Sequence, residues 1–281
     1  MNAPAHGLGR LGVWVPMPVS AEDAAAIEKL GYSAIWVGSS PAAELAFVEP
    51  ILAATRSLVV ATGIVNIWSA PARIVAESFH RIEKSYPGRF VLGIGVGHRE
   101  HTADYRTPFD ALTEYLDELD AAGVPQQRRI IAAMGPRMLT MTAQRSAGTH
   151  PAWTPPSYNE SARQILGADR VLAPIQSIVL TDDAVAARAV GRQLLQVYLG
   201  LSNYVSNWRR LGFTDDDFAD SGSDHLVDAL LAHGGPDEIA DRIKEHFAHG
   251  ADHVALGILT SPHELLDRLA ELAGPLGLTP G

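Results

Sequence analysis

Short runs of apolar residues alternate along the chain with longer stretches in which apolar residues recur every three or four positions. The short runs are typical of buried strands, and the longer stretches have the period of amphipathic helices. Most of the runs are apolar throughout, which favours strands covered on both faces in a parallel sheet. The predicted strands are Leu11–Val15, Ala34–Val37, Leu58–Ile67, Phe90–Ile94, Arg129–Ala133, Val171–Leu180 and Val254–Ile258.

Capping residues and helix breakers mark where the helices begin and end. Ser20 can cap a first turn, with Asp23 three residues later, and Gly31 stops that helix. Pro71 opens another helix, which Pro87–Gly88 ends. The predicted helices are Ser20–Leu30, Ala42–Arg56, Pro71–Tyr86, Pro108–Ala122, Pro136–Ser146, Ser157–Leu166, Ala184–Leu211, a short one ending at Ala232, Pro236–Ala248 and Pro262–Ala273, with an acidic loop at Thr214–Asp224.

This alternation predicts an α/β protein, and the repeated strand–helix units suit a (β/α)8 TIM barrel better than an open sheet. The extra helices after Leu180 predict a helical insertion near the seventh strand, at about residues 182–235. No Pro/Gly-rich linker divides the chain, and barrels of about 250 residues form one domain. We therefore expect residues 1–281 to fold as a single domain.

Composition and charge exclude several classes of protein. The chain has 281 residues, a net charge of −10 and no cysteine, so disulfides, thiolate metal sites and cysteine nucleophiles are excluded. Its basic residues are not clustered, so we expect no nucleic-acid partner. No apolar run reaches the roughly 18 residues of a membrane span, and the stretch after Arg10 lacks the cleavage pattern of a signal peptide. A cytoplasmic location is the expectation.

The sequence RFVLGIGVGH, Arg89–His98, is the most informative stretch. Gly93, Gly95 and Gly97 follow a buried strand pattern at a spacing that does not match the dinucleotide-binding fingerprint. Glycine weakens a strand, so its repetition suggests a flat ligand lying against bare backbone. A sharp turn without any ligand is the alternative interpretation.

The ends of the predicted strands, where barrels bind their ligands, are rich in Gly, Ala, Met and Trp. Carboxylate pairs and Ser–His–Asp sets do not stand out there. Such an apolar and weakly charged mouth suits a planar cofactor that brings its own reactivity. Among the tryptophans, Trp68 is the one that we expect at the mouth, because it follows a strand that contains Gly63.

Two motifs near these strand ends carry candidate chemistry. His98 and His101 are three residues apart, but a metal site needs further ligands, and His246 and His249 look like residues of a solvated helix face. His98 is better placed as a proton donor or hydrogen-bonding group, with a solvent-exposed loop histidine as the alternative. Gly135–Arg137 opens a helix whose free N–H groups could seat an anion, although proline at a helix start is also common without one.

Six segments together resemble the bacterial luciferase-like family of flavin and deazaflavin oxidoreductases, in its coenzyme F420-dependent branch. Each segment is weak alone, but their order and gaps are specific, and the resemblance extends from Leu11 to about Leu272. The segments are LGVWVP, GYSAIWVGSS, LVVATGIVNIWSAPARIVAES, PGRFVLGIGVGH, IIAAMGPRML and GGPDEIADRIKEHFAHGADHVAL.

The resemblance implies a barrel with an insertion around the seventh strand and a deazaflavin or flavin at the C-terminal mouth. It implies a non-prolyl cis peptide bond at Gly63–Ile64 behind the ring, with Asn66 facing the polar edge of the ring. The remaining residues that it implies for cofactor binding are Gly95, Gly97 and His98 beside the ring and Ala133, Met134, Gly135, Pro136 and Arg137 at the phosphate tail. The arginines that could bind the anionic polyglutamyl tail are Arg99, Arg106 and Arg137.

The chain departs from the sugar-phosphate dehydrogenases of this family, which carry an Asp–His pair after the second strand and a Glu after the fourth. Ser39–Ser40 and His98 occupy those places, so sugar-phosphate oxidation is not implied. The resulting hypothesis is an oxidoreductase that transfers a hydride between coenzyme F420 and a small organic substrate. His98 would protonate or orient the substrate, Ser39 or Ser40 would add a hydrogen bond, and the enzyme would be a homodimer.

Three alternatives stay open. The first is an FMN-dependent monooxygenase of the same family, which would need a reductase partner. The second is a non-catalytic protein that binds flavin or deazaflavin, because acid–base residues are few at the predicted mouth. The third, a metal-dependent barrel hydrolase, is disfavoured by the missing ligand cluster.

Overall fold

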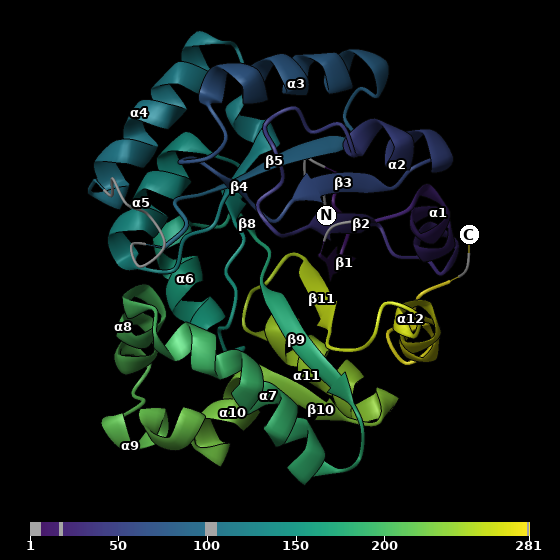
Figure 1. The fold of residues 1–281 in the computed structure, drawn as a ribbon, viewed down its shortest axis with the longest axis vertical. Helices are drawn as coiled ribbons and strands as arrows, with labels where there is room; N and C mark the ends of the chain where they lie inside the picture. Colours follow the sequence, from purple (N-terminus) through teal and green to yellow (C-terminus); the bar gives the residue numbers. More distant parts are fainter. Residues whose placement is uncertain (1–6, 17–18, 99–105, 280) are drawn as a thin grey trace.

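The computed structural model describes residues 7–16, 19–98, 106–279 and 281 of the chain. It contains a central sheet of parallel strands surrounded by helices (Figure 1). The strands are β1 (Leu11–Val15), β2 (Ala34–Val37), β3 (Val59–Thr62), β4 (Val65–Asn66), β5 (Phe90–Gly95), β6 (Arg129–Ile131), β7 (Gly148–Thr149), β8 (Val171–Leu172), β9 (Ile175–Leu180), β10 (Leu231–Gly234) and β11 (Val254–Ile258).

One extended stretch closes this sheet into a barrel. The strand order is β10-β9-β11-β1-β2-β3-β5-β6-β7-β8, and β8 and β9 are consecutive parts of the stretch 171–180. Because β8 pairs with β7 while β9 pairs with β11, this stretch joins the two ends of the ring. Hydrogen bonds from Ala173 N to Thr149 O and from Ala255 N to Pro174 O continue across the break between them. The ring has eight strands when β3 and β4 count as one, β8 and β9 count as one, and β10, which pairs with β9, is left outside it, so the predicted (β/α)8 barrel is confirmed.

Helices cover the outside of the ring and fill the segment after β9. Several begin as the sequence indicates: Ser20 Oγ accepts a hydrogen bond from Asp23 N at 2.9 Å, and Pro136 occupies the first turn of its helix. The α-helices are α1 (Ala21–Lys29), α2 (Val48–Ala54), α3 (Ala72–Ser85), α4 (Pro108–Ala121), α5 (Pro136–Arg145), α6 (Tyr158–Leu166), α7 (Ala184–Leu199), α8 (Ser202–Arg210), α9 (Asp215–Phe218), α10 (Asp224–Leu230), α11 (Pro236–Ala248) and α12 (Leu265–Ala273), and the 3-10 helices are η2 (Gln126–Arg128) and η3 (Ala219–Ser221).

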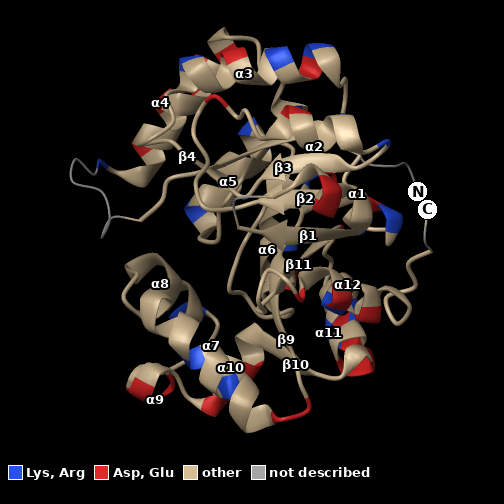
Figure 2. Cartoon of the chain, turned by 45° about the vertical axis from the view of Figure 1, so that its right-hand side comes forward, with Lys and Arg blue, Asp and Glu red and all other residues tan. Residues whose placement is uncertain are grey.

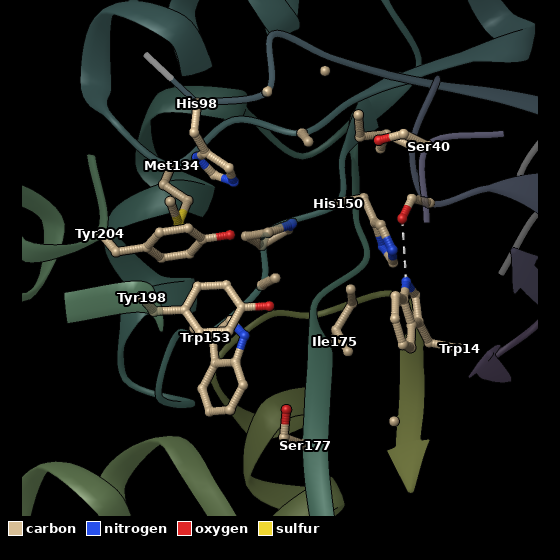
Figure 3. A pocket seen from close by; sticks show the side chains of 18 of the residues that line it. Trp14, Ser40, His98, Met134, His150, Trp153, Ile175, Ser177, Tyr198 and Tyr204 are labelled. Atoms are coloured by element: carbon tan, nitrogen blue, oxygen red, sulfur yellow. Dashed lines mark hydrogen bonds between the residues drawn. The ribbon is translucent and has the colours of Figure 1, made fainter. Parts of the chain in front are cut away.

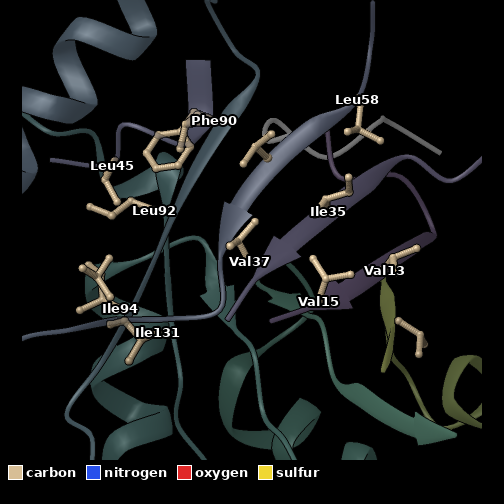
Figure 4. Close-up of a cluster of buried hydrophobic side chains, with 14 of the residues drawn as sticks. Val13, Val15, Ile35, Val37, Leu45, Leu58, Phe90, Leu92, Ile94 and Ile131 are labelled. Atoms are coloured by element: carbon tan, nitrogen blue, oxygen red, sulfur yellow. The ribbon is translucent and has the colours of Figure 1, made fainter. Parts of the chain in front are cut away.

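Side chains of each strand alternate between the helices outside and the barrel interior. Ile35 and Val37 belong to the large outer core (Figure 4), whereas Ala34 and Trp36 belong to a smaller cluster. This smaller cluster consists mostly of alanine and valine around the fully buried Trp36. Charged residues lie mainly on the covering helices (Figure 2). No helix among the described residues is both long and apolar enough to cross a membrane.

Residues 181–235, which we call the α7–β10 segment, form a second core beside the barrel. Trp208 and Leu226 pack there with Trp153, which lies between β7 and α6. The indole N–H of Trp208 donates to the Trp153 carbonyl at 2.8 Å. This hydrogen bond ties the segment to the barrel on the side where the strands end.

Several predicted boundaries were wrong for local reasons. Leu45 has a φ of 49°, which interrupts a helix, so α2 begins at Val48 instead of Ala42. The predicted strand Leu58–Ile67 divides into β3 and β4, and the long helix predicted after Leu180 divides into α7 and α8 around Gly200–Leu201. The acidic loop contains α9, and β7 was not predicted.

His246 was placed on a solvated face, and that interpretation was wrong. Its side chain is fully buried, because α11 turns Ile239, Ile243 and His246 inward together. Its Nε2 lies 2.8 Å from Gln176 Oε1, and its Nδ1 lies 3.0 Å from Asn159 Nδ2. His249, by contrast, is partly exposed and pairs with Glu160.

Candidate active site

A cavity of about 600 Å³ opens where the barrel strands end. Trp14 from β1, Gly63 and Ile64 between β3 and β4, and Gly95 from β5 line one side of it. Figure 3 shows the other side, where aromatic side chains from the α7–β10 segment face the barrel. This position at the C-terminal ends of the strands is the one that barrel enzymes use for catalysis.

The glycines of the Arg89–His98 motif differ in what they accommodate. A Cβ on Gly93 would stand 1.8 Å from the Thr62 carbonyl, so this glycine allows β3 and β5 to approach each other. A Cβ on Gly95 would stand 2.6 Å from Ile64 Cδ1, and one on Gly97 would stand 2.7 Å from Asn66 Nδ2. Gly95 and Gly97 line the cavity and Gly93 does not. The missing side chains therefore make room first for the β3–β4 connection, which itself borders the cavity.

The connection between β3 and β4 has the backbone that the resemblance implies. The Gly63–Ile64 peptide bond is cis. The indole N–H of Trp14 donates to the Gly63 carbonyl at 3.2 Å. Asn66 also lines the cavity, and its Oδ1 accepts a hydrogen bond from Trp68 N at 3.1 Å. Trp68 itself is not among the lining residues, since its indole donates to the Val96 carbonyl at 2.6 Å.

Residues in the left-handed backbone region also gather at the cavity. Ser39 and Ser40 have φ values of 64° and 47°, and Trp153 has a φ of 55°. All three line the cavity. Non-glycine residues rarely adopt this conformation, and where they do they are concentrated at functional sites. Three of the six non-glycine residues with a positive φ in the described chain thus line the cavity, which supports its assignment as the candidate site.

His98 lies at the rim of the cavity, against α8. Its Nδ1 is 3.3 Å from Asn203 Oδ1, and its ring centroid is 5.7 Å from that of Tyr204. Its predicted neighbours Arg99 and His101 lie outside the described residues. Within the described ranges, no group of three or more His, Asp or Glu side chains could hold a metal ion.

The start of α5 borders the site less directly than the sequence suggested. Ala133 and Met134 line the cavity, whereas Gly135, Pro136 and Arg137 lie beyond the lining. The Arg137 guanidinium stacks over the Phe109 ring at 3.9 Å. Arg106 is paired with Glu114 at 2.8 Å. The cation that approaches Gly135 is Arg210, whose Nη2 would be 3.6 Å from a Cβ at that glycine.

His150 was missed, and it is the most unusual titratable group of the site. Burial lowers the pKa of His150 to about 3, which keeps the imidazole neutral. Its Nδ1 lies 2.6 Å from the Ala173 carbonyl and therefore carries the proton. His150 follows β7, a strand of two small residues, so no apolar run marked it as a strand-end position. The aromatic wall of Trp153, Tyr198 and Tyr204 was missed for a similar reason, because helices far from the strand ends supply its tyrosines.

The described lining of the cavity carries no formally charged side chain. Among the described lining residues there is no Asp, Glu, Lys or Arg. The titratable groups among these described residues are two histidines and two tyrosines: His98, His150, Tyr198 and Tyr204. Such a site can bind a flat, conjugated ring and orient a second molecule beside it, but its own side chains supply little acid–base or nucleophilic chemistry. A bound cofactor would have to supply the reactivity.

Comparison with known proteins agrees with this description. Residues 20–123 match the sequence model of a family described as luciferase-like monooxygenase. A search of curated protein sequences found no match. Solved structures, in contrast, align along nearly the whole chain.

One of these is an F420-dependent secondary alcohol dehydrogenase with an F420–acetone adduct, at a TM-score of 0.73, 14% identity and coverage of 95% of this chain and 99% of that one. Another is the F420-dependent tetrahydromethanopterin reductase of Methanopyrus kandleri, which aligns with a TM-score of 0.66 and 14% identity and covers 95% of this chain and 97% of that one. A third is the FMN-bound oxygenating constituent of 3,6-diketocamphane monooxygenase from Pseudomonas putida. It aligns with a TM-score of 0.69 and 11% identity and covers 95% of this chain and 98% of that one. The resemblance to the luciferase-like monooxygenase family is therefore confirmed, by the family model over residues 20–123 and by a barrel fold that these enzymes share.

Proposed function

We propose that this protein is an F420-dependent oxidoreductase that transfers a hydride between the deazaflavin and a small organic substrate. The observation that carries the proposal is the glycine-bordered cavity of about 600 Å³ at the C-terminal ends of the strands, whose described lining holds no Asp, Glu, Lys or Arg. Its volume lies within the range of small-molecule and cofactor sites. The similarity of the fold to two F420-dependent enzymes supports the choice of cofactor.

The residues of the cavity fit a deazaflavin ring. Gly63, Ile64 and Asn66 would hold one side of the ring, and Gly95 and Gly97 would allow its close approach to β5. Ala133 and Met134 would guide the chain of the cofactor toward Gly135–Arg137, where the start of α5 offers unpaired N–H groups to a phosphate. When bound, the deazaflavin supplies the hydride chemistry, and the protein contributes position and a dry environment.

The proposed catalytic residues are His98, Ser39 and Ser40. His98 reaches the cavity from the end of β5, and the hydrogen bond to Asn203 orients its ring. An imidazole in this position can donate a proton to the substrate or orient it by a hydrogen bond. Ser39 or Ser40, on the loop after β2, would supply a second hydrogen bond. We also propose a small-molecule substrate and a homodimeric assembly, as the family resemblance implies, and a cytoplasmic location, as expected from the sequence.

A titration with both cofactors tests the proposal. We expect the purified full-length protein to bind oxidised F420 with a Kd in the micromolar range or below, measured by the change in deazaflavin fluorescence. FMN titrated under the same conditions should bind at least tenfold more weakly. Tight FMN binding without a response to F420 would overturn the choice of cofactor.

The second candidate is an FMN-dependent monooxygenase that receives reduced flavin from a separate reductase. The similarity of the fold to the FMN-bound monooxygenase constituent favours it. It predicts oxygen uptake that depends on reduced FMN. The F420-dependent enzyme predicts no such uptake, so one oxygen-electrode measurement separates the two candidates.

A further inference from the structure

The wall of the cavity opposite the barrel is aromatic. Trp153 and Tyr198 have ring centroids 4.7 Å apart, and Tyr198 and Tyr204 meet edge to face at 4.9 Å. Figure 3 shows both tyrosine hydroxyls directed across the cavity, toward the side formed by Trp14 and His150. The α7–β10 segment thus supplies a rigid wall with two polar tips, placed to contact a molecule lying against the barrel side.

Tyr204 is the more informative of the two tyrosines. It is only 8% exposed, and its ring packs against Trp208, with centroids 5.8 Å apart. Its hydroxyl has no hydrogen-bond partner among the residues that the structure describes. Burial raises the pKa of Tyr204, so the hydroxyl keeps its proton and remains a donor. The hydroxyl is not among the buried polar atoms that lack a partner, so it is accessible from the cavity that Tyr204 lines, where a bound ligand with an acceptor atom can take its hydrogen bond.

The remaining lining of this part of the cavity limits what that ligand can be. Ile175, Leu194 and Leu259 are apolar, and the described lining holds no charged side chain. Moving an ion into such surroundings without a counter-charge is costly, whereas an apolar ring gains from burial and from contact with aromatic faces. The site therefore favours an uncharged molecule with an apolar body.

We propose that the substrate of this site is an uncharged, ring-containing compound whose carbonyl or hydroxyl oxygen accepts a hydrogen bond from the Tyr204 hydroxyl. That this compound is a redox substrate rests on the proposed function. That it binds through the Tyr204 hydroxyl does not depend on that function. Tyr204 would be the residue that selects an oxygen-bearing compound over a hydrocarbon of the same shape. The absence of charged side chains from the described part of the lining would select against carboxylates and phosphates.

Three naphthalene probes of similar size test this without knowledge of the natural substrate. The probes are 2-acetonaphthone, a neutral acceptor; 2-ethylnaphthalene, which is neutral and has no acceptor; and 2-naphthoate, an anion. Calorimetric titration of the full-length protein, with and without F420, should give the tightest binding for 2-acetonaphthone. We expect 2-naphthoate to bind at least about tenfold more weakly.

Substitution of the donor then isolates its contribution. Tyr204→Phe should weaken 2-acetonaphthone binding by about two- to twelvefold, the value of one hydrogen bond, and leave 2-ethylnaphthalene unchanged. Tyr115→Phe is the matched control, because Tyr115 is a buried tyrosine of α4 whose hydroxyl donates to the Ala70 carbonyl outside the cavity. It should affect neither probe.

Equal binding of 2-naphthoate and 2-acetonaphthone would overturn the proposal, as would a Tyr204→Phe variant that binds all probes as the unaltered protein does. The comparison of the three probes uses the unaltered protein, so it stays valid even if the Tyr204→Phe variant does not fold. Because the titrations without F420 do not depend on the cofactor, a failure of the F420 assignment would leave this result interpretable.

Discussion

The indole of Trp36 and the imidazole of His150 stack face to face in the barrel interior, with ring centroids 3.7 Å apart and an interplanar angle of 9°. Trp36 Nε1 donates to His253 Nε2 at 3.0 Å, and His253 Nδ1 lies 3.0 Å from the Gly9 carbonyl. A carbonyl can only accept, so the proton of His253 is on Nδ1 and its Nε2 is the acceptor for Trp36. His150, the one of these three residues that lines the cavity, thus stacks on Trp36, whose hydrogen bond to His253 is between neutral groups.

This arrangement predicts that the protein loses stability in mild acid. Burial lowers the pKa of both His150 and His246 to about 3, whereas an unfolded histidine has a pKa of about 6.5. Below about pH 6.5 the unfolded chain therefore binds protons that the folded protein does not, and unfolding becomes more favourable as the pH falls. We expect the free energy of unfolding to be constant above about pH 7 and to fall by about 2 kcal/mol per histidine between pH 7 and about pH 5. Urea denaturation across this range measures it.

The variant His246→Gln serves as the internal comparison. Glutamine keeps a polar group near Asn159 and Gln176 but does not titrate, so the pH dependence should shrink by about half, or about 2 kcal/mol. The absolute stability of the variant does not enter this comparison, since only the change with pH is read. An unchanged pH profile would contradict the assignment of His246 as a neutral, buried group.

Gly95→Ala is expected to weaken cofactor binding without unfolding the barrel. The added methyl group would stand 2.6 Å from Ile64 Cδ1 and 2.7 Å from Ile64 Cγ1, and because Ile64 lines the cavity, a shift of its side chain would change the space beside it. Overpacking of this kind costs about 1–3 kcal/mol, so the Kd for F420 should rise by about 5- to 150-fold. Fluorescence titration gives the Kd, and the melting temperature reports the fold.

Gly274→Ala is the control for that substitution. Gly274 follows α12 with a φ of −61°, and a Cβ there meets no atom within 4 Å. Cofactor binding should be unchanged in this variant. If Gly95→Ala also binds F420 as tightly as the unaltered protein, the ring does not lie against β5.

His98→Ala should separate binding from turnover. Loss of a positioned acid or hydrogen-bonding group lowers the rate of a proton-coupled step by roughly 100-fold or more, while the Kd for F420 should stay within about twofold. Steady-state assays that follow deazaflavin absorbance, with any substrate that the unaltered enzyme converts, measure the first effect. The fluorescence titration measures the second.

His80→Ala is the matched control, because His80 is exposed on α3 and its Nε2 contacts the Ala122 carbonyl. It should retain full turnover. A His98→Ala variant that also retains full turnover would remove His98 from the mechanism. Normal F420 binding without turnover in the unaltered protein would favour a non-catalytic binding protein.

Much of the fold follows from local patterns that the structure retains. Ser20 caps α1, and Pro136 begins α5 as expected. Each apolar run that was long enough to stand out from the polar residues around it contains a strand in the structure. β7 was missed because Gly148–Thr149 has neither length nor bulk. Its pairing with β6 and β8 is a tertiary property, which no pattern of two residues can reveal.

The candidate site was predictable where it is built from strand ends and unpredictable where distant helices contribute. Gly63, Ile64 and Asn66 line the cavity as expected because they directly follow or form strand ends. Tyr204 reaches it from α8, whose placement depends on the packing of Trp208 below Trp153. His246 shows that a pattern can also be misread, since Ile239 and Ile243 precede it at helical spacing and mark the buried face.

Thr181 and Gly234, at the two ends of the α7–β10 segment, are joined by a β-bridge, next to the parallel pairing of β9 with β10. The segment therefore leaves the barrel and returns to it at neighbouring positions, which backbone pairing holds together. Because the two ends are held together, we expect that helices of another number or length could connect Thr181 to Gly234 without changing the spacing of the barrel strands. The barrel side of the cavity could thus stay the same while the wall that faces it changes. The choice of ligand could then change through this segment without a change in the barrel strands.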